Sequence, residues 1–78
     1  MSRFDSHGRD AFERAVACYI RAVGVPKSEE GIPHFERSAL GPDGIWHLRN
    51  RYAHALAIVT PRGQVYDRPG GHLLGPTP

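Results

Sequence analysis

Histidine is the residue type with the widest chemical range in this chain, because imidazole both binds metals and transfers protons near neutral pH. The five histidines are His7, His34, His47, His54 and His72. None of them shows a spacing typical of zinc sites, such as H-x-x-x-H or paired cysteines and histidines. An even-length hairpin loop would bring His47 and His54 together, but that pair lacks a third ligand. The sequence therefore predicts no metal site.

Other catalytic motifs are also missing from the sequence. There is no G-x-x-x-x-G-K-[ST], no G-x-S-x-G and no G-x-G-x-x-G, the loops that hold phosphates, a nucleophilic serine or a dinucleotide. A catalytic cysteine needs a base beside it, and the neighbours of Cys18, the only cysteine, supply none. We therefore predict a protein that is not an enzyme, with no catalytic residues and no bound cofactor.

Arginine makes up nine of the ten basic residues, and its planar head suits paired contacts with carboxylates or phosphates. Residues 1–43 carry six bases and seven acids, a net charge of −1. Residues 44–78 have a net charge of +3, from four arginines and one acid: Arg49, Arg51, Arg62, Arg68 and Asp67. The C-terminal half is therefore the expected site for an acidic partner.

Four residues are the predicted contacts with a partner: Arg49, Arg51, Tyr52 and Arg62. Arginine and aromatic residues are enriched at protein interfaces. Two alternatives use the same residues. A basic hairpin could follow a nucleic-acid backbone while the Tyr52 ring stacks on a base. A metal-free ribonuclease toxin would instead bring the four residues and His54 together around a phosphate.

A single amphipathic helix is expected over residues 6–23. Its apolar stripe has the spacing i, i+3, i+4, i+7, i+8 and i+11: Phe12, Ala15, Val16, Tyr19, Ile20 and Val23. Asp5 or Ser6 is the expected N-terminal cap. Gly24 should end the helix in a left-handed conformation, with Val25 folding back onto Ile20.

An antiparallel meander is expected after the helix. Residues 33–40 are a candidate short strand, followed by the turn 41–44, which has Pro at its second position and Gly at its fourth. Three longer strands are expected at residues 45–49, 53–60 and 64–67. The loop Pro61-Arg62-Gly63 has Gly where a three-residue hairpin needs a positive φ. That loop pairs Ile58 with Tyr66 and Val59 with Val65.

The pairing of the first two longer strands decides which residues face the helix. An odd-length loop around residues 50–52 puts Trp46 opposite Leu56 and Leu48 opposite His54. The face toward the helix then carries the larger side chains: Trp46, Leu48, Leu56, Ile58 and Tyr66. We favour this register because an even-length loop sets Trp46 and Leu48 beside alanines and buries less apolar area. A slip of one residue would invert the faces of one strand.

The strand at residues 53–60 is apolar on both faces, although a sheet covered by one helix needs only one apolar face. In the favoured register its second face gathers smaller apolar residues: Ile45, Ala55, Ala57, Val59 and Val65. Either the segment 26–43 or the tail covers this face, or a partner does. A second copy of the chain is one such partner, which would make the protein a homodimer.

Length and composition limit the chain to one small domain. Its 78 residues are 40% hydrophobic and 23% charged, which is typical of a globular protein. We expect an α+β domain over residues 1–67, with one N-terminal amphipathic helix packed on a three- or four-stranded antiparallel meander. Residues 68–78 are the expected flexible Pro/Gly-rich tail, which Leu73 and Leu74 could anchor. No apolar run is long enough for a membrane span, and a cytoplasmic location is expected.

The chain as a whole resembles the small orphan proteins of phages and other mobile elements, including anti-CRISPR inhibitors. The resemblance covers the full length: one very short domain, one helix, a meander ending in Gln64-Val65-Tyr66-Asp67, and no catalytic signature. It implies a non-enzymatic inhibitor that binds a protein subunit of a host ribonucleoprotein complex. Such an inhibitor would block target DNA binding or nuclease recruitment. The chain departs from the acidic DNA-mimic type, because only Glu29 and Glu30 form an acidic pair.

Overall fold

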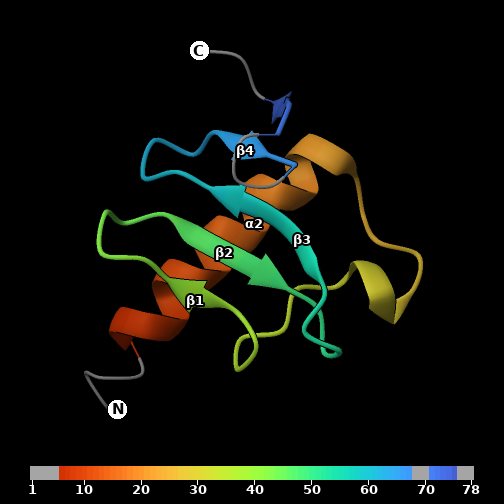
Figure 1. Ribbon diagram of the computed structural model, residues 1–78, viewed down its shortest axis with the longest axis horizontal. Coiled ribbons are helices and arrows are strands. Elements are labelled where there is room, and N and C mark those ends of the chain that lie inside the picture. Colours follow the sequence, from red (N-terminus) through yellow and green to blue (C-terminus); the bar gives the residue numbers. More distant parts are fainter. Residues whose placement is uncertain (1–5, 68–70, 76–78) are drawn as a thin grey trace.

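One helix packs against one face of an antiparallel sheet in the computed structural model, which describes residues 6–67 and 71–75 (Figure 1). This confirms the predicted α+β class. The sheet has five strands in the sequential order β1-β2-β3-β4-β5, and each strand is antiparallel to the next. The fold is therefore a meander with more strands than the three or four expected.

The elements follow one another closely along the chain. The helices are η1 (Ser6–Asp10), a π-helical turn that leads directly into α2 (Ala11–Val23), and the short 3-10 helix η2 (Glu29–Gly31). The strands are β1 (Ala39–Leu40), β2 (Trp46–Arg49), β3 (Ala55–Val59), β4 (Val65–Tyr66) and β5 (Leu73–Gly75).

The helix ends where the sequence predicts. The amide of Gly24 donates to the carbonyl of Ile20 at 2.7 Å, and Gly24 has a φ of 91°, a conformation that glycine adopts without steric cost. The expected contact of Val25 with Ile20 is wrong, because Val25 is 77% exposed. Of the proposed N-terminal caps, Asp5 lies outside the described residues, and the structure describes only the backbone of Ser6.

The candidate strand at residues 33–40 is mostly wrong. Only Ala39 and Leu40 pair with β2. The preceding residues form turns instead, in which the amides of Arg37 and Ser38 both donate to the carbonyl of His34. The turn after β1 is confirmed, since the amide of Gly44 donates to the carbonyl of Gly41 at 3.0 Å.

The β3–β4 hairpin also forms as predicted. Ile58 pairs with Tyr66 and Val59 with Val65. Gly63 has a φ of 86°, and its amide donates to the carbonyl of Thr60. A positive φ at this position of a three-residue loop matches the twist of the two strands.

The predicted register of β2 on β3 is wrong. Trp46 lies opposite Val59 and Leu48 opposite Ala57, but Arg49 lies opposite Ala55. Leu56 therefore has no residue opposite it, which makes it a β-bulge. A bulge adds one residue to one strand, and one added residue exchanges the two faces of the rest of that strand.

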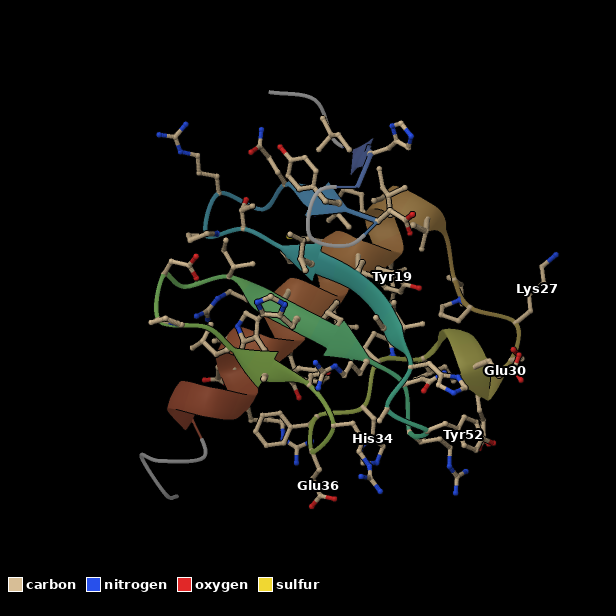
Figure 2. The ribbon with its side chains drawn as sticks, viewed as in Figure 1. Tyr19, Lys27, Glu30, His34, Glu36 and Tyr52 are labelled. Carbon is tan, nitrogen blue, oxygen red and sulfur yellow. The ribbon has the colours of Figure 1, made fainter. Side chains whose placement is uncertain are left out.

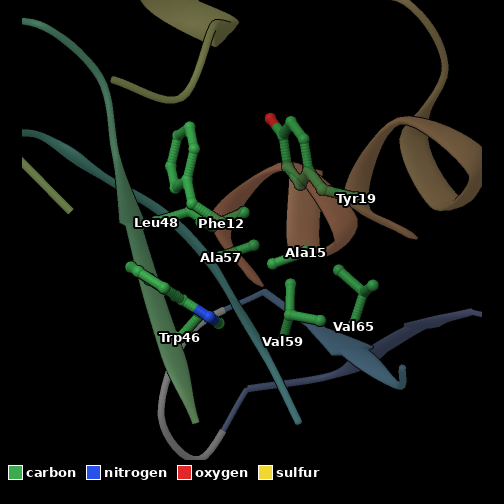
Figure 3. Close-up of a cluster of buried hydrophobic side chains, with 8 residues drawn as sticks. All are labelled: Phe12, Ala15, Tyr19, Trp46, Leu48, Ala57, Val59 and Val65. Carbon is green, nitrogen blue, oxygen red and sulfur yellow. The ribbon is translucent and has the colours of Figure 1, made fainter. Parts of the chain in front are cut away.

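The core consequently uses the smaller side chains of β3. Eight residues form one buried cluster between α2 and the sheet (Figure 3): Phe12, Ala15, Tyr19, Trp46, Leu48, Ala57, Val59 and Val65. The expected face of Trp46, Leu48, Leu56, Ile58 and Tyr66 does not form. Bulky Trp46 packs edge-on against Phe12, with ring centroids 5.6 Å apart, and the small Ala57 leaves room for the helix.

The opposite face of the sheet carries one row of paired side chains across all five strands: Ala39, His47, Ile58, Tyr66 and Leu73. Within residues 6–67 and 71–75, no helix lies over this face (Figure 1). The segment before β1 packs on the helix side instead, where the Phe35 ring lies 5.2 Å from the Phe12 ring. The second face is thus partly apolar as expected, but with different residues.

The expected flexible tail contributes an edge strand. β5 pairs with β4 through Tyr66 and Leu73, and the amide of Asp67 donates to the carbonyl of His72. The leucines at 73 and 74 thus provide the anchor that the sequence suggested, while residues 68–70 and 76–78 lie outside the described part. None of the described helices has the length and apolar character needed to cross a membrane.

The core account predicts a large effect for Leu48→Ala. Leu48 is 1% exposed, and truncating such a leucine lowers the free energy of unfolding by about 2–5 kcal/mol. Leu40→Ala is the matched control, because Leu40 is 52% exposed and its truncation should cost less than about 1 kcal/mol. Urea denaturation measures both, and equal losses would contradict the burial pattern.

Tyr19 predicts a dependence of stability on alkaline pH. Burial raises the pKa of the Tyr19 phenol above its ordinary value of about 10. The unfolded chain then ionises first, so the free energy of unfolding should begin to fall as the pH rises past about 10. Tyr19→Phe should remove this part of the decline in urea denaturation between about pH 8 and about pH 11. If the free energy of unfolding falls equally steeply with pH in the wild type and in Tyr19→Phe, the role of Tyr19 is contradicted.

Candidate functional site

A three-residue loop, Arg51-Tyr52-Ala53, joins β2 to β3. The amide of Asn50 donates to the carbonyl of His54 at 3.1 Å, and the amide of Ala53 donates to the carbonyl of Asn50 at 2.9 Å. Ala53 has a φ of 66°, the left-handed conformation that this loop type requires. In that conformation alanine has about 1–2 kcal/mol of steric strain, whereas glycine has none.

The side chain of Asn50 holds this loop from inside. Asn50 is only 2% exposed. Its Oδ1 accepts hydrogen bonds from the amides of Tyr52 at 2.9 Å and His54 at 3.0 Å. Its Nδ2 donates to the carbonyl of Glu30 at 3.0 Å. One buried amide therefore fixes the hairpin and attaches it to η2, which precedes it by about 20 residues.

The loop displays its own side chains to solvent. Tyr52 is 53% exposed, at the same end of the molecule as Glu30 (Figure 2). Nη1 of Arg51 lies 2.8 Å from Oε2 of Glu29, and the Arg51 guanidinium lies 5.6 Å from the Tyr52 ring centroid. We call five of the exposed side chains at this end the hairpin patch: Glu29, Ile32, Arg51, Tyr52 and His54.

A hollow of about 350 Å³ opens at the border of the hairpin patch. It is lined by Glu29, Ile32, His34 and Arg51. The imidazole Nδ1 of His34 is buried and has no hydrogen-bond partner among the described residues. The backbone amide of His34 donates to the carbonyl of Arg49 at 2.7 Å, which holds this residue against the end of β2.

The structure brings together three of the four predicted contact residues. Arg51 and Tyr52 belong to the hairpin patch, and exposed Arg49 precedes it at the end of β2. Arg62 lies in the β3–β4 loop, at the other end of β3. That strand has five residues and spans about 17 Å. Arg62 therefore lies apart from the other three, outside the hairpin patch.

Sequence reasoning missed the contribution of the segment before β1. Glu29, Ile32 and His34 reach the hairpin through tertiary contacts: Asn50 with η2, Arg51 with Glu29, and the amide of His34 with the carbonyl of Arg49. A local signal existed, because asparagine often bonds the backbone two residues ahead to form a turn. The Asn50 contact with the amide of Tyr52 is such a turn.

The chemistry at this end of the molecule is mixed in charge. Glu29 is paired with the Arg51 guanidinium, and exposed Glu30 lies beside it in the chain. His47 pairs with Ile58, so it does not lie opposite His54. No group of three or more metal-binding side chains was found among the residues that the structure describes. The arrangement offers an aromatic ring, a guanidinium and two carboxylates for surface contacts.

Comparisons of this chain with protein-family models, with curated proteins and with solved structures found no match.

The strain at Ala53 predicts a stabilising substitution. Ala53→Gly should raise the free energy of unfolding by about 0.5–1 kcal/mol, because relief of the steric strain exceeds the added entropy of the unfolded chain. Ala55→Gly, in exposed β3 backbone two residues on, is the matched control and should lower it by about 0.5–1 kcal/mol. If urea denaturation shows that both variants are destabilised, the loop geometry is contradicted.

Proposed function

We propose that this chain is a non-enzymatic binding protein that docks its hairpin patch onto a partner protein. One observation carries the proposal: a loop that is held rigidly from inside displays side chains that add nothing to the core. The three described hydrogen bonds of the Asn50 side chain all join it to the backbone of the loop and of η2. The side chains of Tyr52 and Arg51 above it are exposed.

A rigid display of this kind favours binding. Ordering a loop on association costs free energy, so a loop that is already ordered in the free protein binds more tightly. Ala53 retains backbone strain that a glycine would remove, and such strain persists where the surrounding structure enforces it, often at functional sites. Tyrosine and arginine are also the side chains that contribute most often to binding energy at protein interfaces.

The charges favour a protein partner over a nucleic acid. Binding to nucleic acid depends on basic residues that neutralise phosphates. Here the charge of Arg51 is already balanced by Glu29, with Glu30 next in the chain. The ribonuclease alternative requires Arg62 near His54, but the two lie at opposite ends of β3. A patch with both charges and an exposed ring complements a mixed protein surface better than a phosphate backbone.

The class of partner is inferred from the resemblance of the whole chain to small inhibitor proteins that phages and other mobile elements carry. We propose that the hairpin patch binds a protein subunit of a host nuclease complex in the cytoplasm. Occupation of that subunit would block target DNA binding or recruitment of the nuclease. Exposed Arg49, beside the patch at the end of β2, extends the contact surface toward the uncovered face of the sheet.

Affinity capture with matched variants tests the proposal. The immobilised wild-type chain should retain a partner from host lysate, and Tyr52→Ala and Arg51→Glu should each reduce its recovery at least about tenfold, as loss of a dominant contact does. Arg21→Glu is the control, because it reverses an exposed charge on α2 and should leave recovery unchanged. Quantitative mass spectrometry measures the recovered proteins, and circular dichroism checks that each variant is folded.

Two results would count against the hairpin patch. Equal recovery by all four proteins would exclude it from the contact surface. Alternatively, a gel shift of short oligonucleotides at low salt that Arg51→Glu abolishes would favour the nucleic-acid alternative.

A further inference from the structure

A larger groove lies on the helix side of the sheet, at the end remote from the hairpin patch. It has a volume of about 450 Å³ and runs between α2, the β1–β2 turn and the β3–β4 loop. Its apolar lining includes Ala15, Trp46 and Val59, which belong to the core cluster, and Leu40 from β1. The groove therefore reaches down to the edge of the hydrophobic core, where these three core residues are themselves buried.

Small side chains on the helix keep this groove open. Ala11 and Ala15 line it from α2, four residues apart and thus on one face of the helix. On the opposite wall, Leu40 is 52% exposed although its strand partner, Trp46, is only 8% exposed. A partner that covers the exposed side chain of Leu40 would gain about 25 cal/mol of binding free energy for each Å² of apolar surface removed from water.

Two arginines border the apolar floor. Arg14 lines the groove from α2 and Arg62 lines it from the β3–β4 loop, and both are exposed. In the part of the chain that the structure describes, the single ion pair joins Arg51 to Glu29, so neither of these arginines is paired there. An occupant with carboxylates would match them, because guanidinium and carboxylate form paired hydrogen bonds.

We propose that this groove binds a short segment of a partner protein, in which an apolar side chain is flanked by carboxylates. The apolar side chain lies over Leu40 and the floor formed by Ala15, Trp46 and Val59. The carboxylates pair with Arg14 and Arg62. This site is separate from the hairpin patch, and its occupation does not depend on what the patch binds.

A peptide titration followed by NMR tests the groove. The probe is acetyl-Asp-Asp-Leu-Asp-Asp-amide, added to the isotope-labelled full chain. Saturable shifts are expected at the amides of Ala15, Leu40 and Gly63. The isosteric peptide with asparagine in place of aspartate should bind at least tenfold more weakly, and so should the peptide with serine in place of leucine.

Variants of the chain separate the contributions of charge and shape. Arg14→Glu and Arg62→Glu should each weaken binding of the acidic peptide at least tenfold, while Arg21→Glu leaves it unchanged. Ala11→Leu should fill the groove and abolish binding without changing the charge. It places a favoured helix residue on the helix, so its fold should be retained, which the NMR spectrum checks directly.

Several outcomes would overturn the proposal. One is the absence of saturable shifts with the acidic peptide, and another is shifts confined to the hairpin patch. Binding of dodecanoate without binding of the peptide would assign the groove to a small amphiphilic carboxylate. Shifts at Arg14 and Arg62 with a duplex oligonucleotide but not with the peptide would assign it to nucleic acid.

Discussion

The side-chain amide of Asn50 connects the two parts of the chain that meet at the hairpin patch. It lies in the protein interior, where a polar group without a partner costs about 1–3 kcal/mol, and it is satisfied by the backbones of the β2–β3 loop and η2. The loop must therefore keep one position, since any displacement would leave this amide unpaired. That position fixes where β3 begins, and the bulge at Leu56 then directs Ala57 and Val59 toward α2.

The two ends of β3 carry different surfaces. The hairpin patch presents Tyr52 and the Arg51–Glu29 pair on a rigid loop. At the other end, the groove combines an apolar floor with Arg14 and Arg62, for which the structure shows no acidic partner among the described residues. A chain of 78 residues has a thin core, and much of its surface is therefore free to make contacts.

Features set by neighbouring residues were predictable from the sequence, and features set by distant residues were not. Gly24 and Gly63 were placed correctly because a positive φ is a local requirement that glycine meets. The register of β2 on β3 was not, because the bulge at Leu56 depends on where Asn50 is anchored by η2. Together with the Arg51–Glu29 ion pair and the bond from the His34 amide to the Arg49 carbonyl, that contact holds Glu29 and His34 beside the hairpin. The four contact residues form a compact set in the sequence, but β3 holds Arg62 away from the rest.

Amide hydrogen exchange in variants of Asn50 tests the central claim most directly. The amides of Tyr52 and His54 bond to the side-chain oxygen of Asn50, so Asn50→Ala should speed their exchange at least about tenfold, the equivalent of one lost hydrogen bond. Asn50→Asp keeps that acceptor but loses the donor to the Glu30 carbonyl, so in the folded variant these two amides should stay more protected than in Asn50→Ala. The amide of Gly63, bonded to Thr60 at the far hairpin, should not change in either variant. Unchanged exchange of Tyr52 and His54 in Asn50→Ala would contradict the account.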